Sequence, residues 1–128
     1  MDPVFLSIED IMLIHGRVIA RDGGPAGVRD IGLLSSAAMM PQQTSGGGYV
    51  HEDLAAMAAA YLYHLTRNHA LFDGNKRVGL ASALVFLIAN GVDRLPDEDQ
   101  SAEMTLAVAE GRATKDQVAT WFRKAIGR

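Results

Sequence analysis

Residues 75–89, with the sequence NKRVGLASALVFLIA, contain the longest apolar run of the chain. After the basic start the stretch is apolar on nearly every side of a helix, and such a helix is expected in the middle of a domain. Gly79 interrupts it, at a cost of about 1 kcal/mol relative to alanine, and close approach of another helix is the usual compensation. The run from Val78 to Ala89 is too short to span a bilayer. We therefore expect a buried central helix here.

The segments on either side repeat apolar residues at steps of three and four, which is typical of amphipathic helices. No stretch alternates long enough to predict a strand. Asn90-Gly91 ends the central helix, and the other expected helices cover about residues 7–20, 30–40, 51–67, 96–110 and 114–125. The sequence predicts an all-α fold, with residues 1–128 as a single compact domain of about six helices around one central helix.

Composition excludes several classes of function. The 128 residues include 12 Lys and Arg against 15 Asp and Glu, which gives a net charge of -3, and they include no cysteine. Thiol chemistry and disulfides are thereby excluded, and the acidic balance argues against a general nucleic-acid binder. The acidic N-terminus lacks the basic start and apolar run of a signal peptide. We expect a cytoplasmic protein that contacts neither membrane nor nucleic acid directly.

Polar groups that could perform chemistry are concentrated in residues 69–77, HALFDGNKR, between two expected apolar helices. Gly74 can take backbone angles that other residues avoid, so the amides of residues 74–77 can turn toward a common point at the helix start. Exposed N–H groups and the helix dipole favour an anion there. Lys76 and Arg77 oppose the dipole unless a ligand supplies negative charge. Phosphate is the natural candidate.

Two further side chains in this stretch suit phosphoryl chemistry. Asp73 would repel bare phosphate, but a carboxylate beside phosphates is how Mg²⁺ is usually held. His69 offers an imidazole, the side chain most often used as a general base, and can accept a proton. Each residue alone has a plainer interpretation, because His69 could cap a helix, Asp73-Gly74 could form an ordinary turn, and Lys76 and Arg77 could be a solvated pair. Their convergence favours a functional site.

Other known site types find little support in the sequence. It contains no P-loop, no Gly-rich protein-kinase loop and no His-Arg-Asp triplet. Zinc is not expected, because there is no His-Glu-x-x-His, and His15 lies on the apolar stripe of the first helix, as a packed core histidine would. Arg67 and Asn68 either assist the site or cap the helix that they end. Residues 42–49, which include three consecutive glycines, are either a flap that holds a target segment or a plain surface loop.

The stretch from His69 to Arg77 resembles the central motif of the Fic/Doc family. That motif is His-x-Phe-x-Asp/Glu-Gly-Asn, followed by Gly-Arg in Fic enzymes and by Lys-Arg in Doc (death-on-curing) toxins, and this chain has Lys76, the Doc form. Residues 27–34, 41–42 and 86–91 are also similar to Doc-type chains, so the resemblance covers nearly the whole length. It implies the small all-α fold of that family.

Two positions depart from the family pattern. Leu71 stands where the motif has a Phe, and it can anchor the loop in the core by apolar burial in the same way. Leu80, three residues after Arg77, stands where Fic adenylyltransferases carry a second Arg that grips the γ-phosphate of ATP. Doc proteins also lack this Arg, bind the nucleotide in the reverse orientation and transfer the γ-phosphate.

The resemblance implies a toxin of a toxin–antitoxin module that arrests translation as a serine/threonine protein kinase, phosphorylating a Thr of elongation factor EF-Tu with ATP and Mg²⁺. It implies four catalytic residues, His69, Asp73, Lys76 and Arg77. His69 would be the general base and Asp73 the Mg²⁺ ligand, while Gly74, Asn75, Lys76 and Arg77 would bind the phosphates. It also implies a cognate Phd-like antitoxin as partner. Two alternatives remain, a Fic-type nucleotidyltransferase that transfers AMP and a catalytically idle antitoxin-binding module.

Overall fold

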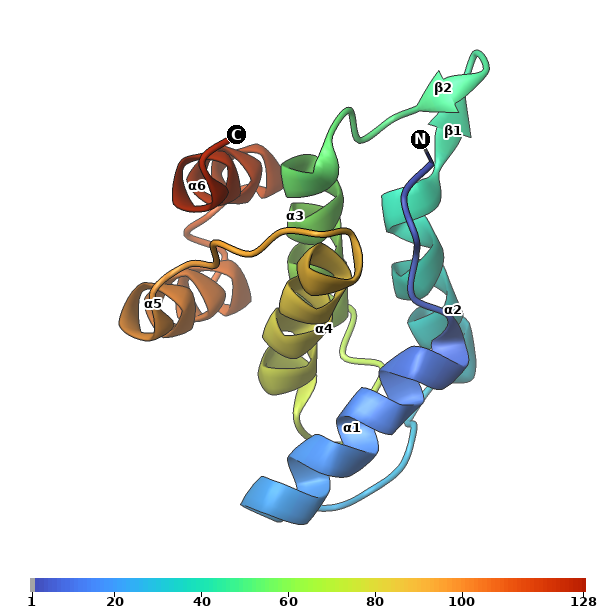
Figure 1. The fold of residues 1–128 in the computed structure, drawn as a ribbon. Helices are drawn as coiled ribbons and strands as arrows, with labels where there is room; N and C mark the ends of the chain where they lie inside the picture. The colour runs from blue at the N-terminus through green and yellow to red at the C-terminus, as the bar shows by residue number, and fades with distance from the viewer. Residues whose placement is uncertain (1) are drawn as a thin grey trace.

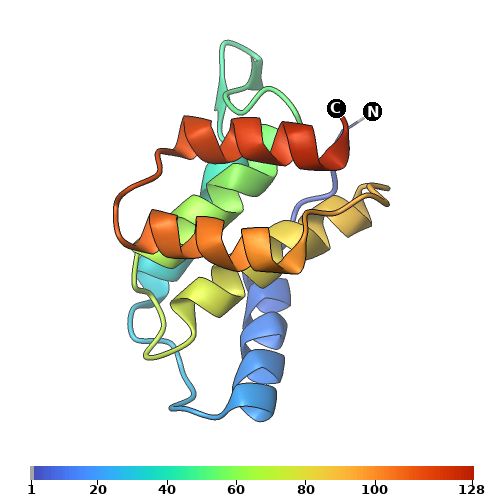
Figure 2. The ribbon, with the colours of Figure 1, turned by 90° about the vertical axis from the view of Figure 1, so that its left-hand side faces the viewer.

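The computed structural model describes residues 2–128, which form six α-helices and one small hairpin (Figures 1 and 2). The elements are α1 (Ile8–Asp22), α2 (Ile31–Met39), the 3₁₀ turn η1 (Met40–Gln42), β1 (Thr44–Ser45), β2 (Gly48–Tyr49), α3 (Leu54–Arg67), α4 (Asn75–Ala89), α5 (Glu98–Ala109) and α6 (Lys115–Ile126). The expected all-α fold is confirmed. The strands of two residues each were not expected, because a pair this short has no alternation to detect.

Helix starts follow from local capping, with one exception. Five helices are preceded by an N-cap residue whose side chain accepts a hydrogen bond from a backbone N–H of the first turn. These N-caps are Ser7, Asp30, Asp53, Asp97 and Thr114. The exception is α4, whose N-cap is Gly74 in the left-handed conformation (φ 85°), which offers no capping side chain. Among the described helices, α4 therefore starts with N–H groups that no capping side chain satisfies.

The centre of the molecule is α3 rather than α4. Most of α3 is buried, and it contacts α2, η1, α4, α5 and α6. Its run of alanines allows neighbours to approach from several sides. By contrast, Val85 and Ile88 on α4 are 40% and 56% exposed. The expectation that residues 75–89 form the central helix was therefore wrong in this detail, because hydrophobicity on every face of a helix does not show which of its faces a neighbour covers.

The contact between α3 and α4 depends on Gly79. A Cβ built at this glycine would lie 3.1 Å from the carbonyl oxygen of Leu62 and 2.5 Å from Oγ1 of Thr66, both on α3. The expected close helix approach is confirmed, and it fixes the start of α4 relative to the end of α3. No helix within residues 2–128 is both long enough and apolar enough to cross a membrane.

Candidate active site

Residues 68–74, between α3 and α4, form a loop that the side chain of Asn75 ties to the helix start. Oδ1 of Asn75 accepts a hydrogen bond from the N–H of Leu71, and Nδ2 donates to the carbonyl oxygen of the same residue, both at 3.0 Å. Leu71 also forms an isolated β-bridge with Val28 and is 3% exposed, whereas Phe72 is 60% exposed. Leu71 thus anchors the loop by burial as expected, and the side chain of Asn75 has a structural task.

His69 is held in an unusual backbone conformation. Its φ of 52° is the only positive φ outside glycine within residues 2–128. The residue follows the C-cap of α3, Asn68, at the place where helices commonly end with a left-handed glycine. An L-residue there costs about 1 kcal/mol or more, although histidine tolerates the region better than most residues. A side chain kept at such a position makes His69 a candidate functional residue.

The end of the loop rests on α1 through His15. This side chain is 5% exposed, and its Nε2 lies 3.0 Å from the carbonyl oxygen of Asp73. His15 is therefore the buried core histidine that the sequence predicted, with the added task of fixing the backbone at Asp73. Arg67 and Asn68 have structural partners, because Arg67 donates to the carbonyl oxygen of Val108 and Asn68 to that of Leu33.

The residues predicted to bind phosphate and metal line one cavity of about 480 Å³ at the start of α4. Its walls are Thr66, His69, Phe72, Asp73, Gly74, Asn75, Lys76, Arg77 and Ala109. All six predicted site residues are thus brought together, and the volume lies within the range of small-molecule sites.

Arg77 lies between two carboxylates. Its Nη1 is 3.1 Å from Oδ2 of Asp22, at the end of α1, and its Nη2 is 3.3 Å from Oδ2 of Asp73. The other oxygen of Asp73 accepts a hydrogen bond from the N–H of Gly74 at 2.8 Å. The guanidinium of Arg21, and after it that of Arg77, holds the pKa of Asp22 below its usual range. The guanidinium that was expected to bind phosphate is thus paired with two carboxylates.

The residues of the cavity fit a nucleotide phosphate with Mg²⁺. Uncapped N–H groups at the start of α4, together with Lys76 and Arg77, suit phosphate oxygens. Within residues 2–128 no three His, Asp or Glu side chains gather to hold a metal ion. Asp73 would therefore contribute one carboxylate and the phosphates further ligands, as is usual for Mg²⁺.

Comparison with known proteins identifies the source of this arrangement. A sequence model of the Fic/Doc family matches residues 5–87. The chain belongs to the Fic/Doc family. Toxin Doc of Mycolicibacterium smegmatis is 49% identical over 77 residues, which are 60% of this chain and 59% of that protein. Protein kinase doc of Escherichia phage P1 is 33% identical over 122 residues, which are 95% of each of the two chains.

Residues 22–30 lie against the Fic/Doc motif, and residues 42–49 are remote from it (Figure 1). The N–H of Phe72 donates to the carbonyl oxygen of Gly27, and Gly24 lies against the carboxylate of Asp73. The hairpin of residues 42–49 lies near the beginning of α3, whereas the motif follows the end of α3 (Figure 1). Of the two interpretations left open for residues 42–49, this arrangement favours the surface loop over the flap, because the length of α3 separates the hairpin from the motif.

Sequence reasoning missed two side chains that contact this Fic/Doc site. Asp22 had a signal, because an acidic residue in the last turn of a helix opposes the helix dipole and so suggests a cationic partner. For Arg29 there was no sequence signal beyond its place in residues 27–34, which are similar to Doc-type chains. Both partners are distant in sequence, at Arg77 and His69 respectively.

Proposed function

We propose that this protein is a Doc-type toxin of a toxin–antitoxin module, a serine/threonine protein kinase that transfers the γ-phosphate of ATP to a Thr of EF-Tu and so arrests translation. The observation that carries the proposal is that His69, Asp73, Lys76 and Arg77 line one cavity at the uncapped start of α4. A relative that aligns over 95% of both chains is itself named a protein kinase. EF-Tu as the target rests on the resemblance to Doc toxins alone.

Leu80 favours phosphate transfer over AMP transfer. It lies one turn further along α4 than Arg77 and is an apolar, partly buried side chain packed against the core. At this position the helix therefore offers no guanidinium that could grip a terminal phosphate in the adenylyltransferase orientation. The charge of the site is concentrated at the start of the helix, at Lys76 and Arg77, where the phosphate to be transferred would be bound.

In this reaction the imidazole of His69 accepts the proton of the target hydroxyl as its oxygen attacks the γ-phosphorus of ATP, and the bond from that phosphorus to the bridging oxygen breaks, so that ADP leaves. General base catalysis of this kind contributes about 10²–10⁴ in rate. The N–H groups at the start of α4 and the side chains of Lys76 and Arg77 orient the phosphates and take up the charge that develops on them. Mg²⁺ held by Asp73 would neutralise charge across the phosphates. To hold the ion, Asp73 would give up its contact with Arg77.

The decisive experiment is incubation of the protein with ATP, Mg²⁺ and EF-Tu, followed by mass spectrometry of EF-Tu. A phosphate-sized adduct on a Thr supports the proposal, and an AMP-sized adduct or none overturns it. Lys76→Ala should abolish the adduct. Lys124→Ala, which alters an exposed lysine on α6 away from the cavity, is the matched control and should leave the adduct unchanged.

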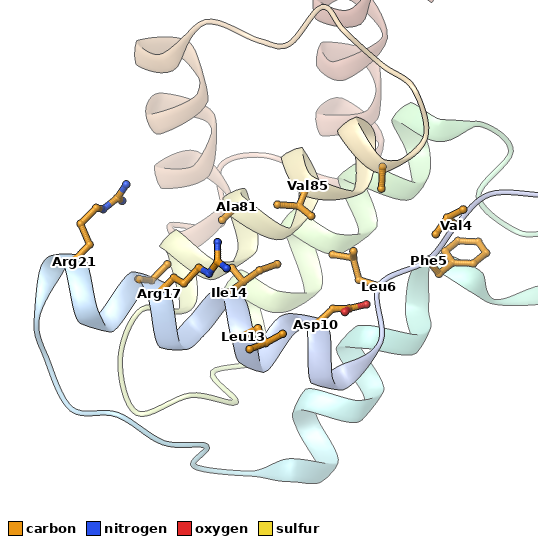
Figure 3. A pocket seen from close by; sticks show the side chains of 12 residues that line it. Val4, Phe5, Leu6, Asp10, Leu13, Ile14, Arg17, Arg21, Ala81 and Val85 are labelled. Carbon is orange, nitrogen blue, oxygen red and sulfur yellow. The ribbon is translucent and has the colours of Figure 1, made fainter.

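The antitoxin in this proposal binds the apolar groove between α1 and α4 (Figure 3), which has a volume of about 630 Å³. Leu13 and Val85 line it and are 67% and 40% exposed. Arg17 and Arg21 lie toward one end and Asp10 toward the other (Figure 3). This pattern suits an amphipathic helical segment of the antitoxin whose acidic side chains face the two arginines.

Introducing a charge into the groove tests this partner. Leu13→Glu should weaken binding of the antitoxin from the neighbouring reading frame by at least about tenfold, because it places a charge in an apolar contact. Leu106→Glu alters a similarly exposed leucine on α5 outside the groove and should not change the affinity. Equal affinity of the Leu13→Glu variant would place the antitoxin elsewhere.

A further inference from the structure

Arg29 contacts the backbone of His69 directly. Its Nε donates a hydrogen bond to the carbonyl oxygen of His69 at 2.7 Å, across 40 positions of sequence. Because the donor is a guanidinium, this bond is charge-assisted and stronger than a bond between neutral groups. The side chain of Arg29 does not line the cavity of the site, so its contact with the reaction passes through His69.

Backbone groups of the same segment hold the next peptide unit. The N–H groups of Arg29 and Asp30 both donate to the carbonyl oxygen of Ala70, at 2.8 Å and 3.0 Å. Asp30 in turn caps α2 through its side chain. The backbone of residue 29 is therefore fixed on a helix start, and its side chain reaches back to His69 from a defined position.

The bond from Arg29 acts at the most constrained residue of the loop. His69 is the one non-glycine residue with a positive φ in the described chain, and a left-handed residue of this type persists only when its surroundings hold it. Other carbonyl groups of the loop have partners of their own, since Leu71 is bound by Asn75 and Asp73 by His15. The carbonyl of His69 depends on the Arg29 side chain.

We propose that Arg29 is a positioning residue for the proposed phosphate transfer, holding the backbone of His69 in its left-handed conformation so that the imidazole faces the cavity. The inference rests on the proposed function of His69 as the base. Arg29 acts on the rate of the chemical step, because a displaced base is less effective, and it does not touch the nucleotide.

The test compares Arg29→Met with Arg29→Lys, which keeps a charged donor. For Arg29→Met we expect kcat for phosphate transfer to fall by about tenfold or more, since small misplacements of a reacting group carry large rate costs. The KM for ATP should change less than about twofold, because nucleotide binding energy is not involved. Arg29→Lys should restore part of kcat. Arg112→Met, which alters an exposed arginine paired with Glu110, is the matched control and should leave kcat unchanged.

A second measurement separates this inference from the proposed function. The chain has four histidines, so imidazole proton resonances can be assigned by substitution. In the nucleotide-free protein, Arg29→Met should shift the resonance of His69 and leave those of His51 and His64 in place. If the wild type transfers no phosphate, the proposed function fails. The inference about Arg29 is then tested by the shift of the His69 resonance alone, and the absence of that shift overturns it. If the wild type does transfer phosphate, an unchanged kcat in Arg29→Met overturns the inference. A rise in KM for ATP as large as the fall in kcat also overturns it.

Discussion

Replacement of Gly79 by alanine tests the packing that positions the active site. In α4 the added methyl group would meet Oγ1 of Thr66 at 2.5 Å and the carbonyl oxygen of Leu62 at 3.1 Å. The carbonyl belongs to the backbone of α3 and cannot move aside without shifting that helix, and the side chain of Thr66 is buried. Gly16 on α1 is the matched control, because a Cβ there meets nothing within 4 Å.

Two effects of opposite sign determine the outcome. Alanine gains about 1 kcal/mol over glycine in a helix interior, and this gain applies to both positions. Overpacking costs about 1–3 kcal/mol, and we place Gly79 at the upper end because one obstacle is backbone. Gly79→Ala should therefore lower the free energy of unfolding by about 2 kcal/mol, whereas Gly16→Ala should raise it by about 1 kcal/mol.

Thermal unfolding followed by circular dichroism measures both values. For a chain of this size 1 kcal/mol corresponds to about 3–5 °C in Tm, so the two variants should differ by roughly 10 °C. A second substitution, Thr66→Ala, should recover part of the loss in Gly79→Ala by removing the nearer obstacle. If Gly79→Ala stabilises the protein as much as Gly16→Ala does, the close approach of α3 and α4 does not constrain the fold and the reasoning is refuted.

Three further predictions concern charge and loop anchoring. Asp22→Asn should tighten ATP binding in titration calorimetry by about three- to tenfold, since a unit charge within about 6 Å of phosphate costs roughly 0.7–1.4 kcal/mol at an effective dielectric of 40–80. Asn75→Ala should lower the free energy of unfolding in urea by about 2 kcal/mol, because it loses two hydrogen bonds to Leu71. Burial, with smaller effects of Lys115 and His51, lowers the pKa of His64 to about 4. Below its ordinary value of about 6.5 the unfolded state binds the proton and the folded state does not, so stability should fall from pH 7 to pH 4, and less so in His64→Gln.

Each of these has a control and a contradicting result. Asp93→Asn, at an exposed position, should leave ATP affinity unchanged, and weaker binding by Asp22→Asn would mean that Asp22 orients Arg77 instead of competing with phosphate. A loss below about 0.5 kcal/mol in Asn75→Ala would show that the loop is held without its side chain. A pH profile of His64→Gln that matches the wild type between pH 4 and 7 would assign that dependence to other groups.

Much of the fold and site was predictable because its determinants are local. Helix starts follow from caps such as Asp97 and Thr114, which act within one turn of the helix. The predicted site residues of the cavity, from His69 to Arg77, also lie within one short stretch, since a loop that runs into a helix start places neighbouring residues around a common point. The anchoring role of Leu71 was expected from the resemblance to the family motif, in which a Phe stands at this position.

The contacts that brace the site were not predictable in this way. His15, Asp22 and Arg29 reach the motif from 58, 55 and 40 positions away in sequence, and no local rule connects them with it. Residues 42–49 show the same limit of local rules. Their glycines indicated a loop, but they could not indicate the end of α3 near which the hairpin lies.

By itself, the sequence determined that the chain is helical, where most helices begin and end, and which nine consecutive residues are candidates for the chemistry, because periodicity, capping and loop-to-helix geometry act over a few residues. The tertiary structure alone decided that α3 is the central helix, that Asp22 pairs with Arg77 and that Arg29 donates a hydrogen bond to the backbone of His69. These depend on which helix faces meet, and that is settled by packing the whole chain around a single core in which Gly79 allows α3 and α4 to approach.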